Sequence, residues 1–146
     1  MNLLLIHKVK LIVVVILCVL AVSFNCHAEE VKLYKSWTTT EIVQEVVWQG
    51  LHVVDWGQTR DIAKRPDEYY EKNTWLGEHP SVDEVNQYMI ISAILHLGIS
   101  WVLPNNIEFK VFDYSINPRT IWQCITIVGT ASTVSHNHSI GLRMNF

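Results

Sequence analysis

The sequence predicts an all-α protein, with an N-terminal signal or anchor helix followed by a three-helix membrane or membrane-associated bundle. The 146 residues are 49% hydrophobic and include 6 Trp, which makes the chain more apolar than a typical soluble domain. An apolar leader comes first, and three later segments each begin with a helix-capping pattern. The length leaves room for one helical domain over 29–146 after a leader over 1–28.

The leader has the features of an export signal. Lys8 and Lys10 precede an uncharged apolar segment, and the small residues Cys26 and Ala28 suit cleavage by signal peptidase after Ala28. An uncleaved signal anchor is the alternative, although a membrane span takes about 20 apolar residues and this segment is shorter. Both alternatives predict a protein of the bacterial inner membrane, exported through a signal sequence, with the periplasm as the other location.

Charge and cysteine content exclude several classes. The net charge of -3 and the lack of a basic run argue against nucleic acid as a partner. Of the 3 Cys, Cys18 and Cys26 lie in the leader, so Cys124 stands alone in the mature chain and no C-x-x-C pattern exists. We expect Cys124 to be a small core residue on a helix. No strong motif requires a cofactor.

Three segments carry signals for the start of a helix. The predicted helices run from about Thr39 to Lys64, from about Val82 to Leu103 and from about Arg119 to Val134. Their start signals are Thr38 with Glu41, Ser81 with Glu84, and Asn117 followed by Pro118. In the first two, a hydroxyl accepts from a backbone amide while the carboxylate reaches back. Proline at a first helical position loses no hydrogen bond.

The three helices differ in polarity. The first is amphipathic, and the second is the best candidate for a membrane span, because Met89 to Leu103 contains only Ser92, His96 and Ser100 as polar members before Pro104 ends the helix. The third places Trp122, Thr126, Gly129 and Thr133 on one face, which predicts close contact with another helix.

Basic residues give an expected topology. The connection after the first helix carries four of them, Arg60, Lys64, Arg65 and Lys72, whereas the one after the second carries only Lys110 before Arg119. Because Lys and Arg are retained on the cytoplasmic side, alternating spans place the first connection inside.

The candidate site begins on the first predicted helix. His52, Asp55 and Thr59 project from nearly the same face, with Gln58 beside them. A His-Asp pair can orient an imidazole for acid–base chemistry or bind a cation. Alternatively, these side chains are polar cross-links between packed helices. We call this face the polar stripe. If the two helices pack, it is faced from the second helix by Tyr88, Ser92 and His96. A metal site would then have the right composition in His52, Asp55 and His96.

The connection between the first two helices adds two candidates. Structural roles account for Gly77, Pro80 and Ser81, since these residues turn the chain and start the next helix. Asn73 and His79 are explained less fully, so a re-entrant connection that covers the polar stripe is the functional alternative. Near the C-terminus, His136 and His138 fit a solvated tail or, less well, a metal pair.

A set of short segments resembles a known family. The segments are Asp55-Trp-Gly-Gln-Thr59, Asn73-x-x-Leu76-Gly77-x-His79-Pro80-Ser81 and Asn137-x-x-Ile140-Gly141, with Tyr88 and His96 between them. They resemble small uncharacterised membrane proteins of bacteria and their prophages, over most of the mature chain. In that pattern Pro commonly follows the Asn, whereas Thr74 follows Asn73 here, which loosens the expected turn. The resemblance implies a membrane protein and no particular activity.

Three functional hypotheses follow. The first is a non-enzymatic envelope protein whose polar residues serve helix packing and contacts with membrane lipid, a membrane-protein partner or a second copy of the chain. The second is an intramembrane enzyme or metal-binding protein that uses His52, Asp55, Thr59, Asn73, His79 and His96. The third is a soluble periplasmic helical domain. Conservative replacement of Asp55 separates the first two, and extraction from membranes separates the third.

Overall fold

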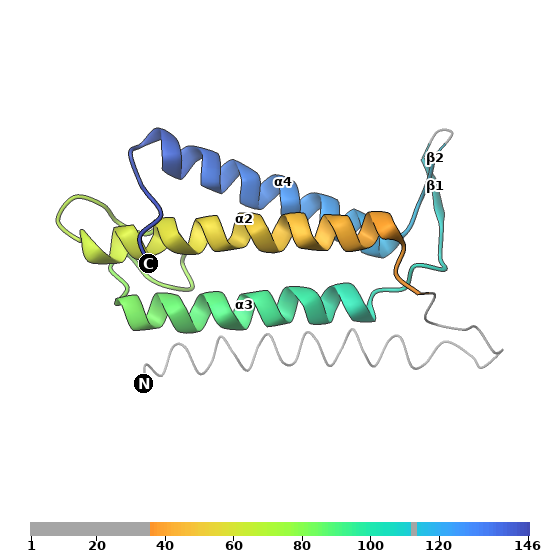
Figure 1. Cartoon of the computed structure of the whole chain (residues 1–146), viewed down its shortest axis with the longest axis horizontal. Helices are drawn as coiled ribbons and strands as arrows, with labels where there is room; N and C mark the ends of the chain where they lie inside the picture. The colour runs from red at the N-terminus through yellow and green to blue at the C-terminus, as the bar shows by residue number, and fades with distance from the viewer. Residues whose placement is uncertain (1–35, 112–113) are drawn as a thin grey trace. The chain divides into compact units, whose positions relative to one another are not determined.

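The computed structural model describes residues 36–111 and 114–146, which belong to the compact unit Leu33–Phe146. The predicted leader over 1–28 lies outside the described residues. The elements in chain order are α2 (Thr39–Lys64), α3 (Val82–Val102), β1 (Phe109–Val111), β2 (Tyr114–Ile116) and α4 (Pro118–Ser139). Helix α2 packs against both α3 and α4 and lies between them (Figure 1). The predicted three-helix, all-α architecture is confirmed.

All three predicted helix starts are confirmed. Thr38 Oγ1 accepts from the backbone N–H of Glu41 at 3.2 Å, and the Glu41 carboxylate accepts from the backbone N–H of Thr38 at 2.8 Å. Ser81 and Glu84 form the same reciprocal cap on α3. The side chain of Asn117 caps α4. These caps satisfy backbone donors that the first turn of a helix leaves without partners.

Helix α4 is longer than predicted. It continues past Val134 to Ser139, so His136 and His138 lie on a helix and the expected tail is wrong there. Both side chains are nevertheless exposed. The physical stop signal is Gly141, whose φ of 96° is the left-handed conformation that commonly ends a helix.

The inward face of α4 also differs from the prediction. Gln123 is fully buried, and its neighbour Cys124 is exposed, so the expectation of a core cysteine is wrong. Consecutive helical residues point about 100° apart, which explains why the two differ. Gly129 is exposed, and a Cβ added there would meet nothing within 4 Å. The predicted small-residue face therefore makes no close helix contact at Gly129.

A two-stranded antiparallel hairpin joins α3 to α4 and was not predicted. Phe109 pairs with Ile116 and Lys110 pairs with Ser115. Each strand has only 3 residues, too few to show an alternating pattern in the sequence.

The bundle buries polar side chains and exposes apolar ones. Among the described residues the buried apolar set is small: Trp48, Ile62, Val85, Met89 and Leu142. The buried polar set is larger: Glu41, Glu45, His52, Gln58, Thr59, Asp61, His96, Ser100, Asn105, Arg119, Gln123 and Asn137. Large apolar side chains face outward on every helix, for example Val46 at 66% exposure, Ile94 at 66% and Val128 at 69%. Soluble domains show the opposite distribution of buried residue types.

Candidate functional site

The polar stripe of α2 begins well before His52. Glu45 lies seven residues before His52, and Glu41 lies four residues before Glu45, on the same face; all three are buried. Sequence reasoning used Glu41 only as a cap and missed Glu45 as a site residue. The sequence does contain a signal for both: at helical spacing, these two carboxylates fall on the face of His52, Asp55 and Thr59, nearer the start of the helix.

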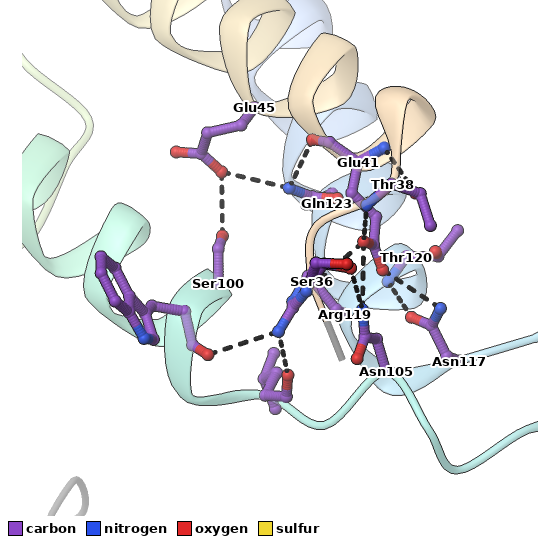
Figure 2. A network of polar contacts seen from close by, with 12 residues as sticks. Ser36, Thr38, Glu41, Glu45, Ser100, Asn105, Asn117, Arg119, Thr120 and Gln123 are labelled. Carbon is purple, nitrogen blue, oxygen red and sulfur yellow. Dashed lines mark hydrogen bonds and ion pairs between the residues drawn. The ribbon is translucent and has the colours of Figure 1, made fainter. Parts of the chain in front are cut away.

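The first cluster of the stripe is centred on the Glu41 carboxylate (Figure 2). Arg119 Nη1 lies 3.4 Å from Glu41 Oε2, and both side chains are 1% exposed. The side-chain amides of Asn105 and Asn117 each donate to this carboxylate at 3.2 Å. Arg119 also donates from Nη2 to the backbone oxygen of Leu103 at 3.0 Å. One buried carboxylate and its guanidinium partner thus join the starts of α2 and α4 to the end of α3.

The second cluster is centred on the Glu45 carboxylate. Its Oε1 accepts from Gln49 Nε2 at 2.9 Å and from His96 Nδ1 at 3.0 Å. Its Oε2 accepts from Ser100 Oγ at 2.9 Å and from Gln123 Nε2 at 3.3 Å, and both partners point towards it in Figure 2. Ser100 and His96 belong to α3 and Gln123 to α4, so all three helices meet at this carboxylate. Four donors satisfy the ionised form of the group.

Aromatic rings enclose the histidines of this cluster. The imidazole of His96 lies parallel to the indole of Trp48, with centroids 3.5 Å apart and planes at 5°. His52 stacks on the same indole at 4.7 Å and 10°. Trp122 of α4 lies 5.3 Å from the His96 ring. The histidines are thus held by flat apolar surfaces as well as by hydrogen bonds.

The predicted meeting of the second helix with the polar stripe is observed for Ser92 and His96. Ser92 Oγ lies 3.1 Å from His52 Nε2, and the same nitrogen lies 3.0 Å from the backbone oxygen of Met89. A carbonyl only accepts, so this nitrogen of His52 carries the hydrogen. His96 reaches the stripe at Glu45. His52 and His96 therefore share one neighbourhood around Trp48.

The other predicted residues do not join them. Asp55 accepts from Asn137 Nδ2 of α4 at 3.3 Å, and Thr59 is buried further along α2. Asn73 accepts from the backbone N–H of Trp75 at 3.0 Å, the local contact of an Asx turn. His79 is exposed. The six candidates thus divide into one pair around Trp48 and four residues placed elsewhere.

The metal hypothesis is not supported by this arrangement. Within residues 36–111 and 114–146, no three His, Cys, Asp or Glu side chains come close enough to hold a metal ion. His52, Asp55 and His96 therefore do not form the predicted ligand set. The reason is that His96 Nδ1 is turned towards Glu45, His52 Nε2 faces a backbone oxygen, and Asp55 binds Asn137.

The connection between α2 and α3 has the structural roles predicted for its turn residues. Gly77 has a φ of 83°, which other residues rarely adopt, and Ser81 caps α3. The connection lies against the end of α4, where Tyr69 Oη donates to the backbone oxygen of Ile140 at 3.3 Å.

Chemically, the described site offers two buried carboxylates, a guanidinium and two imidazoles, each engaged by partners from another helix. Such groups can fix helix packing or hold and release protons. No protein-family model, curated protein or solved structure matches this chain.

Proposed function

We propose that the protein is a small helical bundle embedded in the bacterial inner membrane, and that its buried polar side chains hold the helices together without catalysing a reaction. The observation that carries this proposal is the distribution of side chains, polar inside and apolar outside. Apolar side chains that face outward can lie among lipid acyl chains without a free-energy penalty. Exposure of the same side chains to water carries one. The segments that resemble bacterial and prophage membrane proteins agree with this proposal.

Helix α3 supports it most directly. Among the described helices it is the one long and apolar enough to cross a membrane by itself, and 22% of its span is buried in the bundle. The core helix of a soluble protein is mostly buried. Here Ile90, Ile91, Ile94, Leu97 and Trp101 are all exposed. We assign this surface to contact with lipid.

Helices α2 and α4 carry more polar residues, and the proposal accounts for them through pairing. Ionisable side chains inside a membrane face the bundle interior and engage one another. Glu41 with Arg119 and Glu45 with His96 follow this rule. Meanwhile Val43, Val46 and Val128 point outward. Each helix thus has a polar face towards its neighbours and an apolar face for lipid.

The arrangement of basic residues supports one orientation in the membrane. Lys64 Nζ donates to Asn145 Oδ1 at 2.6 Å, and Lys72 Nζ lies 3.4 Å from His136 Nε2, so the end of α2 and the C-terminal segment lie at the same end of the bundle. Arg60 and Arg143 belong to this end too. By the positive-inside rule, this end and the C-terminus face the cytoplasm.

Membrane extraction of the full chain tests the proposal. A C-terminally tagged protein should stay in the membrane pellet after a sodium carbonate wash. A C-terminal fusion to green fluorescent protein should fluoresce, and a fusion to alkaline phosphatase should be inactive, because only the cytoplasmic side supports the first and only the periplasm the second. Release by carbonate would instead support a soluble periplasmic domain, and an active phosphatase fusion would reverse the orientation.

A further inference from the structure

The hydrogen bonds around His96 define two alternative protonation states. Nδ1 of the ring faces Glu45 Oε1 at 3.0 Å, and an ionised carboxylate only accepts, so this nitrogen carries a hydrogen. Nε2 faces Thr126 Oγ1 at 2.9 Å. The state of this second nitrogen depends on the direction of the Thr126 hydroxyl.

That hydroxyl has three acceptors within reach. Besides His96 Nε2, its oxygen lies 2.9 Å from the backbone oxygen of Trp122 and 3.1 Å from that of Gln123. A threonine hydroxyl has one hydrogen to donate and two lone pairs that accept. If it donates to His96, the imidazole is neutral. If it donates to the Trp122 carbonyl, its lone pair is free to accept from a protonated Nε2.

We propose that His96, Glu45 and Thr126 form a buried proton-binding site, in which the Thr126 hydroxyl turns from His96 to the Trp122 carbonyl when Nε2 takes up a proton. The proton comes from a hydronium ion of the solvent: its O–H bond breaks as one N–H bond forms at Nε2, a water molecule is left, and no covalent bond of the protein breaks. The proton is the ligand, so the site needs no further cofactor. This inference goes beyond the proposed function and does not require that the bundle lies in a membrane.

Charged and aromatic groups surround the His96 ring. His96 is 3% exposed, its counter-ion Glu45 is in direct contact, and the parallel Trp48 indole offers a π-face at 3.5 Å. On α2, the ionisable groups near His96 are Glu45 and the second imidazole, His52. Helix α4 faces His96 with the uncharged Thr126 and Trp122, and its own cation Arg119 is paired with Glu41.

Proton uptake at this position would act on all three helices at once. The carboxylate that balances His96 also accepts from Ser100 of α3 and Gln123 of α4. Protonation turns the hydrogen bond from the neutral His96 ring to the ionised Glu45 carboxylate into an ion pair, which is the stronger contact. The site therefore links the protonation state to how firmly α2, α3 and α4 are joined.

Nitrogen NMR of the full chain in detergent micelles, with ¹⁵N-labelled histidine, tests the inference. Long-range ¹H–¹⁵N correlation spectra distinguish singly from doubly protonated imidazole, and loss of signals in His96→Gln assigns the ring. We expect wild type to pass between the two states as the pH is changed. In Thr126→Val the midpoint should move down by roughly one pH unit, a tenfold loss of proton affinity, because the charged ring loses its acceptor.

Matched variants make the test specific. Thr126→Ser keeps the hydroxyl and should titrate as wild type does, while Glu45→Gln should lower the midpoint further because it removes the counter-ion. Ser92→Ala removes a hydroxyl beside His52 and should leave the His96 midpoint unchanged. The inference is overturned if His96 keeps one protonation state over the whole range in which the protein is folded, or if Thr126→Val titrates like wild type. Should Thr126→Val fail to fold, an unchanged midpoint in Glu45→Gln overturns it equally.

Discussion

Arg119 of α4 and Glu41 of α2 form a buried ion pair at the end of the bundle where both helices begin, with Nη1 and Oε2 3.4 Å apart. The guanidinium also lies over the ring of Trp37, 4.9 Å from its centroid. Charges taken out of water are costly unless each has partners. Here Glu41 has Asn105 and Asn117 as further donors, so the pair is the centre of a hydrogen-bonded cluster.

Removing one charge of this pair should destabilise the bundle strongly. Glu41→Gln leaves the Arg119 guanidinium buried without its counter-ion, and we expect a loss of about 3–5 kcal/mol in the free energy of unfolding. The loss is measured as the change in SDS-induced unfolding of purified protein in mild detergent.

Two controls belong to that experiment. Glu68→Gln removes the exposed partner of Arg65, which lies 3.2 Å away, and should change stability by less than about 1 kcal/mol. The double variant Glu41→Gln/Arg119→Met should recover part of the loss, since no unpaired charge remains. Equal effects of Glu41→Gln and Glu68→Gln would show that the pair is not buried in the folded protein.

Gly57 should tolerate no side chain, because the C-terminal segment packs directly on it. A Cβ at this position would lie 3.0 Å from Phe146 Cε2 and 3.1 Å from Met144 Cα. The backbone N–H of Asn145 donates to the Gly57 oxygen at 3.1 Å, which holds the segment there. We expect Gly57→Ala to lower the free energy of unfolding by about 1–3 kcal/mol.

Gly50 of the same helix is the matched control. A Cβ there would meet nothing within 4 Å, so Gly50→Ala should stabilise α2 by up to about 1 kcal/mol through helix propensity alone. The same unfolding measurement applies to both variants. If the two substitutions had the same sign of effect, the C-terminal segment would not be docked on α2.

The thiol of Cys124 reports whether lipid surrounds the bundle. It is exposed on α4, and Gln44 Nε2 donates to it at 3.3 Å. In inverted inner-membrane vesicles, whose outer face is the cytoplasmic one, we expect little reaction with a charged maleimide, because the charged reagent does not enter hydrocarbon. The measurement is made with Cys18→Ser and Cys26→Ser in place. Ser139→Cys, at the end of α4, is the control that should react; rapid labelling of Cys124 would favour a water-exposed α4.

Asp55 should behave as a packing residue. It accepts from Asn137 Nδ2, a contact that an asparagine oxygen also makes, so Asp55→Asn should keep the amount of folded protein in the membrane nearly unchanged. Asp55→Leu removes the acceptor and leaves the buried amide of Asn137 without it, with an expected loss of about 1–3 kcal/mol. If Asp55→Asn proved as harmful as Asp55→Leu, the negative charge itself would be required, as in a catalytic or ion-binding role.

Local sequence signals predicted the helices well. The bounds of α2 agree with the expected Thr39 to Lys64, and the capping boxes at Thr38 and Ser81 form as expected. Caps depend on residues three positions apart, so the chain specifies them without its fold. The end of α4 was wrong because the glycine that stops it, Gly141, lies beyond the segment in which apolar periodicity is visible.

The sequence by itself determined that the chain forms three capped helices and that one face of α2 carries ionisable groups. Only the tertiary structure decided which partners those groups meet. Glu41 with Arg119 and Glu45 with His96 are separated by 78 and 51 residues, and helical spacing carries no information across such distances. The rotation of each helix about its axis, set by packing, turned Gln123 inward and Cys124 outward, and it gave Asp55 the partner Asn137 on α4.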